Sequence, residues 1–159
     1  WKNHDWIVKV DADAVFFPDR LKMHIDALRT PQGSMVYLLN NAYRFKFMGA
    51  LEIMTRQALE RYYKYQKRCS VGGGTHSGGE DFWMKSCLDG IGVDHQTDSQ
   101  LLIDRYVVQD SCAERSVVAF HFYKKVATWN TCHRQALDAQ AKPWAAANRS
   151  GKVLLGARM

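Results

Sequence analysis

Two aspartates follow a short apolar segment near the start of the chain. The segment Trp6–Val10 leads directly into Asp11-Ala12-Asp13. Side chains two positions apart at the end of a strand point to the same side, so both carboxylates can face one ion. Carboxylate oxygens favour hard divalent ions such as Mg²⁺ and Mn²⁺, and such an ion can neutralise a diphosphate leaving group. The pair alone does not establish a metal site, because Asp-x-Asp is also common in surface turns.

A histidine and a lysine end a later apolar segment, Phe120–Lys124. Strand alternation places His121 on the same face as Val117 and Ala119. A histidine in this position is either a metal ligand or a hydrogen-bonded core residue, and the sequence leaves both interpretations open. Lys124 adds a compact positive charge that suits a phosphate group.

Two adjacent acids, Glu80 and Asp81, follow the glycine-rich stretch 71–79. So many glycines predict a mobile loop, and the acids then open a helix. Acids in a first helical turn commonly do no more than stabilise the helix N-terminus. They are also well placed to act as a general base if the loop closes over a substrate and excludes water.

The elements that would position these residues alternate between strand and helix. Apolar and β-branched runs predict strands at Trp6–Val10, Met35–Leu39, Tyr43–Met48, Leu101–Ile103 and Val117–Phe122. Periodicity and stop signals predict helices that begin at Pro18, Thr55, Glu80 and Thr128, with Thr55 and Thr128 as N-caps. The alternation indicates one α/β layered domain over residues 1–142, followed by a flexible basic tail over residues 143–159.

The composition is that of a globular domain, since 47% of the 159 residues are apolar and 24% are charged. The net charge of +6 comes from scattered basic residues, with the densest patch between Arg56 and Arg68 on one predicted helix. We interpret this patch as a solvated helix face and expect no nucleic-acid partner, because no recognised module accompanies it. No apolar run has the length of a membrane span, so any membrane anchor would lie outside this segment.

Four cysteines are widely spaced along the chain and form no CxxC pair, which disfavours a zinc ribbon. They are Cys69, Cys87, Cys112 and Cys132. Their even number is compatible with disulfides formed in a secretory compartment, and Asn148-Arg149-Ser150 is a glycosylation sequon. Buried free thiols are the alternative, especially for Cys87 on an apolar helix stripe.

Four segments in chain order carry a family resemblance that spans most of residues 5–125. Segment 6–18 contains the Asp-x-Asp pair, and segment 47–59 joins a glycine-containing strand to a helix. Gly79–Phe82 contains the acid pair and is followed by Cys87-Leu88 and Gly92-Val93, and 120–124 contains the histidine. Together they resemble the motifs of GT-A glycosyltransferases, in particular the Fringe-like and core-1 β1,3-galactosyltransferase-like members.

The resemblance implies a GT-A fold, a Rossmann-like mixed sheet flanked by helices, of which this chain is the C-terminal catalytic half without the base-binding part. It implies metal-dependent, inverting transfer of a hexose from a nucleotide diphosphate donor, with UDP favoured, to a hydroxyl of a glycan or protein. The expected location is the Golgi or endoplasmic reticulum lumen.

The resemblance also assigns roles to individual residues. Asp13 would be the chief ligand of Mn²⁺ or Mg²⁺, Asp11 would touch the ion, its waters or the donor sugar, and His121 would complete the site. Lys124 would contact the donor diphosphate.

The remaining roles concern the acceptor side of the reaction. Asp81 would be the catalytic base, with Glu80 as the fallback, and Gly49 would let the backbone approach the substrates closely.

Two other functions also fit the residues. A haloacid-dehalogenase-like phosphatase would use Asp11 as nucleophile, Asp13 as general acid/base and Mg²⁺ as cofactor. A non-catalytic domain that binds sugar or only keeps the fold is the other alternative.

Overall fold

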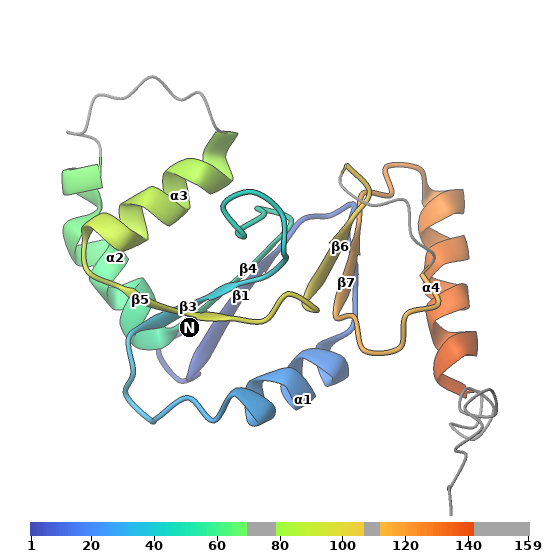
Figure 1. Ribbon diagram of the computed structural model, residues 1–159, viewed down its shortest axis with the longest axis horizontal. Coiled ribbons are helices and arrows are strands. Elements are labelled where there is room, and N and C mark those ends of the chain that lie inside the picture. The colour runs from blue at the N-terminus through green and yellow to red at the C-terminus, as the bar shows by residue number, and fades with distance from the viewer. Residues whose placement is uncertain (70–78, 107–111, 142–159) are drawn as a thin grey trace, which may run out of the picture.

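The computed structural model describes residues 1–69, 79–106 and 112–141. In these ranges seven strands and four helices form an α/β arrangement, as expected from the sequence (Figure 1). The strands are β1 (Trp6–Val10), β2 (Val15–Phe16), β3 (Val36–Leu39), β4 (Leu51–Thr55), β5 (Asp94–Thr97), β6 (Leu102–Asp104) and β7 (Ala119–His121). The helices are α1 (Pro18–Leu28), α2 (Arg56–Cys69), α3 (Gly79–Gly90) and α4 (Val126–Ala141).

The strands form two mixed sheets. In the larger sheet the order is β1-β4-β3-β5, with antiparallel pairing except between β3 and β5. In the smaller sheet the order is β2-β7-β6, where β2 and β7 are antiparallel and β6 and β7 are parallel. The chain passes from one sheet to the other between β1 and β2, which is where the two aspartates lie.

Strand β3 of the larger sheet is buried on both faces. Along β3, Val36 and Leu38 belong to the core cluster that includes Leu21 of α1, whereas Tyr37 and Leu39 belong to the cluster with α2 and α3. Accordingly, α1 lies on one side of this sheet and α2 and α3 lie on the other (Figure 1). A strand buried on both faces carries a continuous apolar run, which explains why the sequence of β3 is easily recognised.

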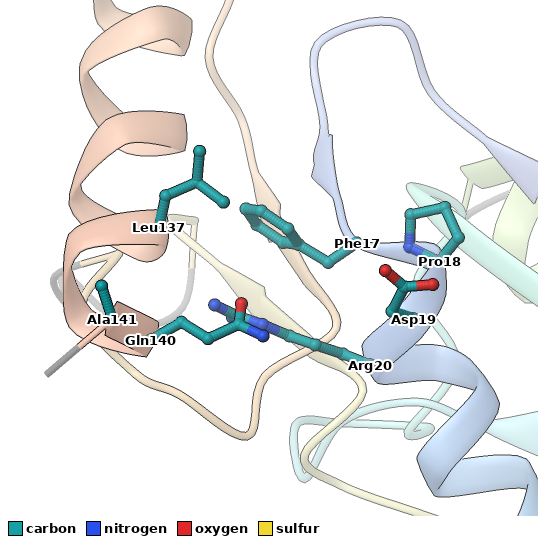
Figure 2. Close-up of a pocket in the computed structure, with 7 residues that line it drawn as sticks. All are labelled: Phe17, Pro18, Asp19, Arg20, Leu137, Gln140 and Ala141. Atoms are coloured by element: carbon teal, nitrogen blue, oxygen red, sulfur yellow. The ribbon is translucent and has the colours of Figure 1, made fainter. Parts of the chain in front are cut away.

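A buried arginine joins α1 to the last helix. The guanidinium of Arg20 donates hydrogen bonds to the carbonyl oxygens of Glu114, Val117 and Ala136 at 3.1, 2.8 and 3.0 Å. It lies 4.2 Å from the ring centre of Phe17, and both side chains reach toward α4 (Figure 2). Arg20 is 1% exposed, so these contacts hold α4 against the smaller sheet.

The predicted strand Tyr43–Met48 is wrong. The segment is a turn region in which Arg44 and Lys46 have positive φ angles of 47° and 65°, a conformation that no strand contains. The buried amide of Asn40 holds this loop by donating to the carbonyls of Met48 and Leu51. The strand that pairs with β1 is instead β4, directly before α2.

The observed starts of three of the four helices agree with the predicted starts to within one residue. Pro18 is the first residue of α1, and Thr55 caps α2 by accepting a hydrogen bond from the Ala58 amide at 3.3 Å. The predicted cap at Thr128 is wrong, because α4 begins at Val126 and the Thr128 hydroxyl donates to the Lys125 carbonyl. Of the helices that the structure describes, none has the length and apolar character that crossing a bilayer requires.

Two disulfides link neighbouring elements. Cys69–Cys87 links the end of α2 to α3, and Cys112–Cys132 links the segment before β7 to α4. The alternative of buried free thiols, including the one at Cys87, is therefore wrong. The sequon and the predicted tail 143–159 lie outside the described residues, as does the glycine-rich stretch up to residue 78.

Candidate metal centre

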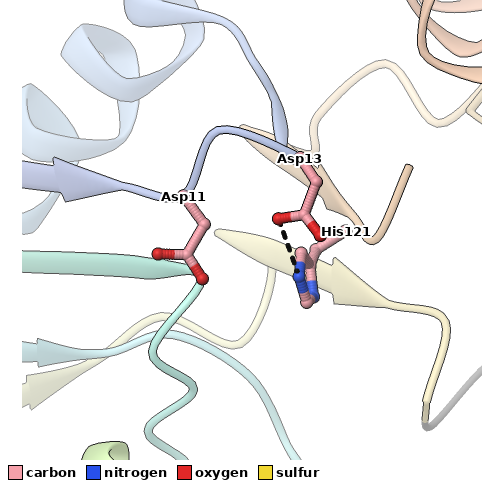
Figure 3. A group of neighbouring side chains, drawn as sticks. All are labelled: Asp11, Asp13 and His121. Atoms are coloured by element: carbon pink, nitrogen blue, oxygen red, sulfur yellow. Dashed lines mark ion pairs between the residues drawn. The ribbon is translucent and has the colours of Figure 1, made fainter. Parts of the chain in front are cut away.

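Asp11, Asp13 and His121 converge at the junction of the two sheets (Figure 3). One ligand atom from each lies within 4.8 Å of the other two, and all three side chains are half-buried. Nε2 of His121 is 3.4 Å from Oδ1 of Asp13. Two carboxylates and one imidazole are a donor set that holds a divalent ion, so the grouping expected from the sequence is compatible with a metal site.

Backbone hydrogen bonds bring these residues together. The Ala14 amide donates to the Asp11 carbonyl at 3.0 Å, which closes a turn around the Asp-x-Asp pair. The Tyr123 amide donates to the Asp13 carbonyl at 2.8 Å, and β2 pairs with β7 immediately beside it. The turn after β1 is thus fixed against the end of β7, where His121 lies.

A buried aspartate that the sequence analysis missed orients His121. Oδ2 of Asp104 lies 2.8 Å from Nδ1 of His121, and Oδ1 accepts a hydrogen bond from the Tyr106 amide at 2.8 Å. This leaves Nε2 facing the two metal-site aspartates. A carboxylate behind the distal nitrogen is the usual way in which proteins fix the tautomer of a metal-binding histidine.

The charges around His121 favour its protonated form. Burial alone would lower its pKa, but the hydrogen bond and charge of Asp104, together with the charges of Asp13 and Asp11, raise the pKa above its ordinary value. A metal ion must displace this proton to bind Nε2, so metal binding at this site is coupled to pH.

Lys9 and Glu52, also missed by the sequence analysis, lie beside the metal centre. Nζ of Lys9 donates to Oε1 of Glu52 at 2.8 Å and to the Gly49 carbonyl at 3.0 Å. It also lies 3.6 Å from Oδ1 of Asp11 and 3.7 Å from Oε2 of Glu80. Lys9 therefore lies close to groups from four places: the turn after β1, the loop before β4, β4 itself and α3.

The two partners of this ion pair differ in burial, and their pKa values respond differently. Glu52 is 2% exposed, and desolvation raises its pKa although the hydrogen bond from Lys9 opposes this. Burial alone would lower the pKa of Lys9, but the hydrogen bond and charge of Glu52, with Glu80 and Asp11, raise it. Lys9 is thus held firmly in its charged form.

The acid pair opens α3, close to Gly49. Oδ1 of Asp81 accepts a hydrogen bond from the Phe82 amide at 2.8 Å, and both acids lie in the first turn of α3, where a negative charge stabilises a helix. A Cβ atom at Gly49 would lie 3.2 Å from Oε2 of Glu80 and 3.3 Å from Cβ of Asp81. A side chain at position 49 would therefore crowd the two acids, and the expected close approach of substrates at Gly49 stays a prediction.

Lys124 lies on the other flank of the metal centre. It lines a cavity of about 420 Å³ together with Asp13, Tyr123, Trp129 and two smaller side chains. Nζ of Lys124 is 5.4 Å from the ring centre of Phe122. Asp13 is therefore shared between the metal centre and a cavity that has a positive charge on its wall.

The site residues expected from the sequence are thus linked by contacts: Lys9 connects Asp11 with Glu80, Gly49 adjoins Glu80 and Asp81, and Lys124 lines a cavity with Asp13. Comparisons of the chain with protein-family models, with curated proteins and with solved structures found no match.

Proposed function

We propose that this chain is the catalytic half of a metal-dependent GT-A glycosyltransferase. It would transfer a hexose from a nucleotide diphosphate donor, with UDP favoured, to a hydroxyl of a glycan or protein, with inversion. The observation that supports this best is the convergence of Asp11 and Asp13, from the turn after β1, with His121 at the end of β7, so that one ligand atom of each lies within 4.8 Å of the others. The order of the motifs along the chain supports it independently.

The donor set fits Mn²⁺ or Mg²⁺, with Mn²⁺ favoured because an imidazole joins the two carboxylates. When bound, the ion would supply Lewis-acid neutralisation of the departing diphosphate. Asp13 and His121 would hold it, with Asp11 as the third ligand or in contact with its waters. Lys124, on the cavity that Asp13 lines, would add a positive charge for a phosphate oxygen.

The acids at the start of α3 would act on the acceptor. Asp81 would take the proton of the attacking hydroxyl as that oxygen bonds to the anomeric carbon, and the donor diphosphate would leave from the opposite face. Glu80 is the second candidate for this role. Gly49 leaves room for both acids, because a Cβ atom there would lie 3.2 Å from Oε2 of Glu80 and 3.3 Å from Cβ of Asp81.

A donor-turnover assay tests this proposal. The chain is incubated with Mn²⁺ and a panel of UDP- and GDP-hexoses, and release of the nucleoside diphosphate is followed with and without glycan acceptors. We expect Asp81→Asn to lose turnover by on the order of a hundredfold while Mn²⁺ binding is retained. Asp94→Asn makes the same aspartate-to-asparagine change at an exposed position on β5 and serves as the matched control.

The two alternatives give different results in the same assay. Hydrolysis of a simple phosphate ester that requires Asp11 but not Asp81 would establish the phosphatase. Binding of Mn²⁺ with no turnover of any donor or ester would leave a domain that keeps the fold and the metal site without catalysis.

A further inference from the structure

Lys9 is a positive charge held in place by the fold. Its partner Glu52 is 2% exposed and lies directly opposite it in the β1–β4 register, so the carboxylate is fixed by the sheet. A second hydrogen bond to the Gly49 carbonyl fixes the ammonium further. The Lys9 side chain itself is 48% exposed, so the ammonium is accessible to solvent while the buried Glu52 carboxylate holds it.

The remaining neighbours of this ammonium are acids of the proposed site. An ammonium has three N–H groups, and two are used by Glu52 and Gly49. Asp11 and Glu80 lie at the longer distances of 3.6 and 3.7 Å from Nζ, within reach of electrostatic attraction. The positive charge of Lys9 thus attracts both Asp11, directly after β1, and Glu80, in the first turn of α3.

We propose that Lys9 is a positioning residue, a built-in cation that holds the carboxylates of Asp11 and Glu80 on one side of the site and competes with the divalent ion for Asp11. The proposal rests on the proposed function, because it assigns the competing ion to Asp11, Asp13 and His121. Its consequence is that the ion alone binds weakly, whereas an anionic diphosphate, attracted by both cations, strengthens metal binding. Metal and donor binding are then coupled, and the coupling is reciprocal.

The sign of one measurable change separates this role from a purely structural one. Removing a structural residue loosens the site and weakens metal binding. Removing a competing cation beside Asp11 does the opposite, because the repulsion between two cations a few ångströms apart is lost. At low ionic strength we expect Lys9→Met to bind Mn²⁺ about five- to tenfold more tightly, and high salt to shrink the difference.

The experiment is a Mn²⁺ titration followed by EPR, with and without inorganic pyrophosphate as the diphosphate probe. Lys9→Arg keeps the charge and should match the wild type. Lys22→Met removes one positive charge from an exposed pair with Asp26 on α1 and is the matched control. Because Lys9→Met leaves the buried Glu52 without its partner, the double variant Lys9→Met/Glu52→Gln is measured beside it, and circular dichroism checks that each variant is folded.

The expected result is tighter Mn²⁺ binding in both Lys9→Met and the double variant, with a smaller gain on adding pyrophosphate than in the wild type. Equal or weaker Mn²⁺ binding in a folded variant that lacks the Lys9 charge overturns the proposal, while the metal site and the proposed function stand. A wild-type chain that binds no Mn²⁺, with or without pyrophosphate, overturns the metal site and this proposal together.

Discussion

Asp104 is the residue whose replacement tests the metal centre most informatively, because it contacts no ion itself. Its two oxygens have separate partners, Nδ1 of His121 and the Tyr106 amide, both at 2.8 Å. In Asp104→Asn the side chain has one oxygen and one amide group to offer. If the oxygen keeps the Tyr106 amide, the NH₂ group faces Nδ1 and favours the tautomer that carries its proton on Nε2, which cannot bind a metal.

Asp104→Asn should weaken both metal binding and folding, because the carboxylate behind His121 is lost. Loss of a carboxylate behind a metal-binding histidine costs about ten- to a hundredfold in metal affinity, or ~1.4–2.7 kcal/mol. Folding stability should fall by about 1–3 kcal/mol, because a charge-assisted hydrogen bond to a buried group is replaced by a neutral one. The metal titration and a urea unfolding curve measure the two quantities separately.

The chain contains a matched control for this substitution. Oδ2 of Asp98 lies 2.6 Å from Nδ1 of His24, and its Oδ1 accepts a hydrogen bond from the Gln100 amide at 3.0 Å. The contact pattern is the same as that of Asp104, but His24 lies outside the Asp11–Asp13–His121 group. We expect Asp98→Asn to lose stability and keep its Mn²⁺ affinity. Equal Mn²⁺ affinities for Asp104→Asn and Asp98→Asn would refute the assigned role of Asp104.

Three further predictions concern the acids, the pH dependence and the disulfides. Gly49→Ala brings a Cβ to 3.2 Å from Glu80 and should lower donor turnover by on the order of tenfold with Mn²⁺ affinity unchanged; unchanged turnover would show that the acids need no exact placement. Because the pKa of His121 is raised, its protonated form adds stability that is full below about pH 6.5 and is lost as the pH rises through the raised pKa. Mn²⁺ affinity should follow the opposite course and rise over that range, and a titration from pH 5.5 to 8 with no such rise would remove His121 from the site. Replacing Cys112 and Cys132 by alanine opens a link across 20 residues and should cost about 3 kcal/mol in a urea unfolding curve, with a loss below 1 kcal/mol counting against the link.

Local patterns were sufficient to predict the main helices and to single out Asp11, Asp13 and His121, which the structure brings together. Asp11, Asp13 and His121 were each recognisable because they end apolar strands, and their convergence followed from a family resemblance. The pairing of β2 with β7, which creates the convergence, involves a strand of only two residues that no sequence periodicity reveals. Local signals therefore identified the candidate ligands but not the strand pairing that brings them together.

The supporting residues could not be predicted, because each depends on a partner distant in sequence. Lys9 meets Glu52 only across the β1–β4 pair, and β4 was obscured by the incorrect strand assigned to Tyr43–Met48. Asp104 lies one residue beyond a predicted strand and 17 residues from His121, with no local signal that links them. Similarly, β5 has the polar sequence Asp94–Thr97 and is a strand only because it pairs with β3. Tertiary context determines such elements more than their own composition does.

The most direct test of the central claim is whether Asp13 and His121 together bind a divalent ion. Mn²⁺ is titrated by EPR, with and without UDP and GDP, against the wild type, Asp13→Ala and His121→Ala, with His24→Ala as the histidine control. We predict binding that a nucleoside diphosphate strengthens, that both site variants abolish and that the control retains. Binding that needs Asp13 but ignores His121 and the nucleotide would contradict the glycosyltransferase assignment and favour the phosphatase.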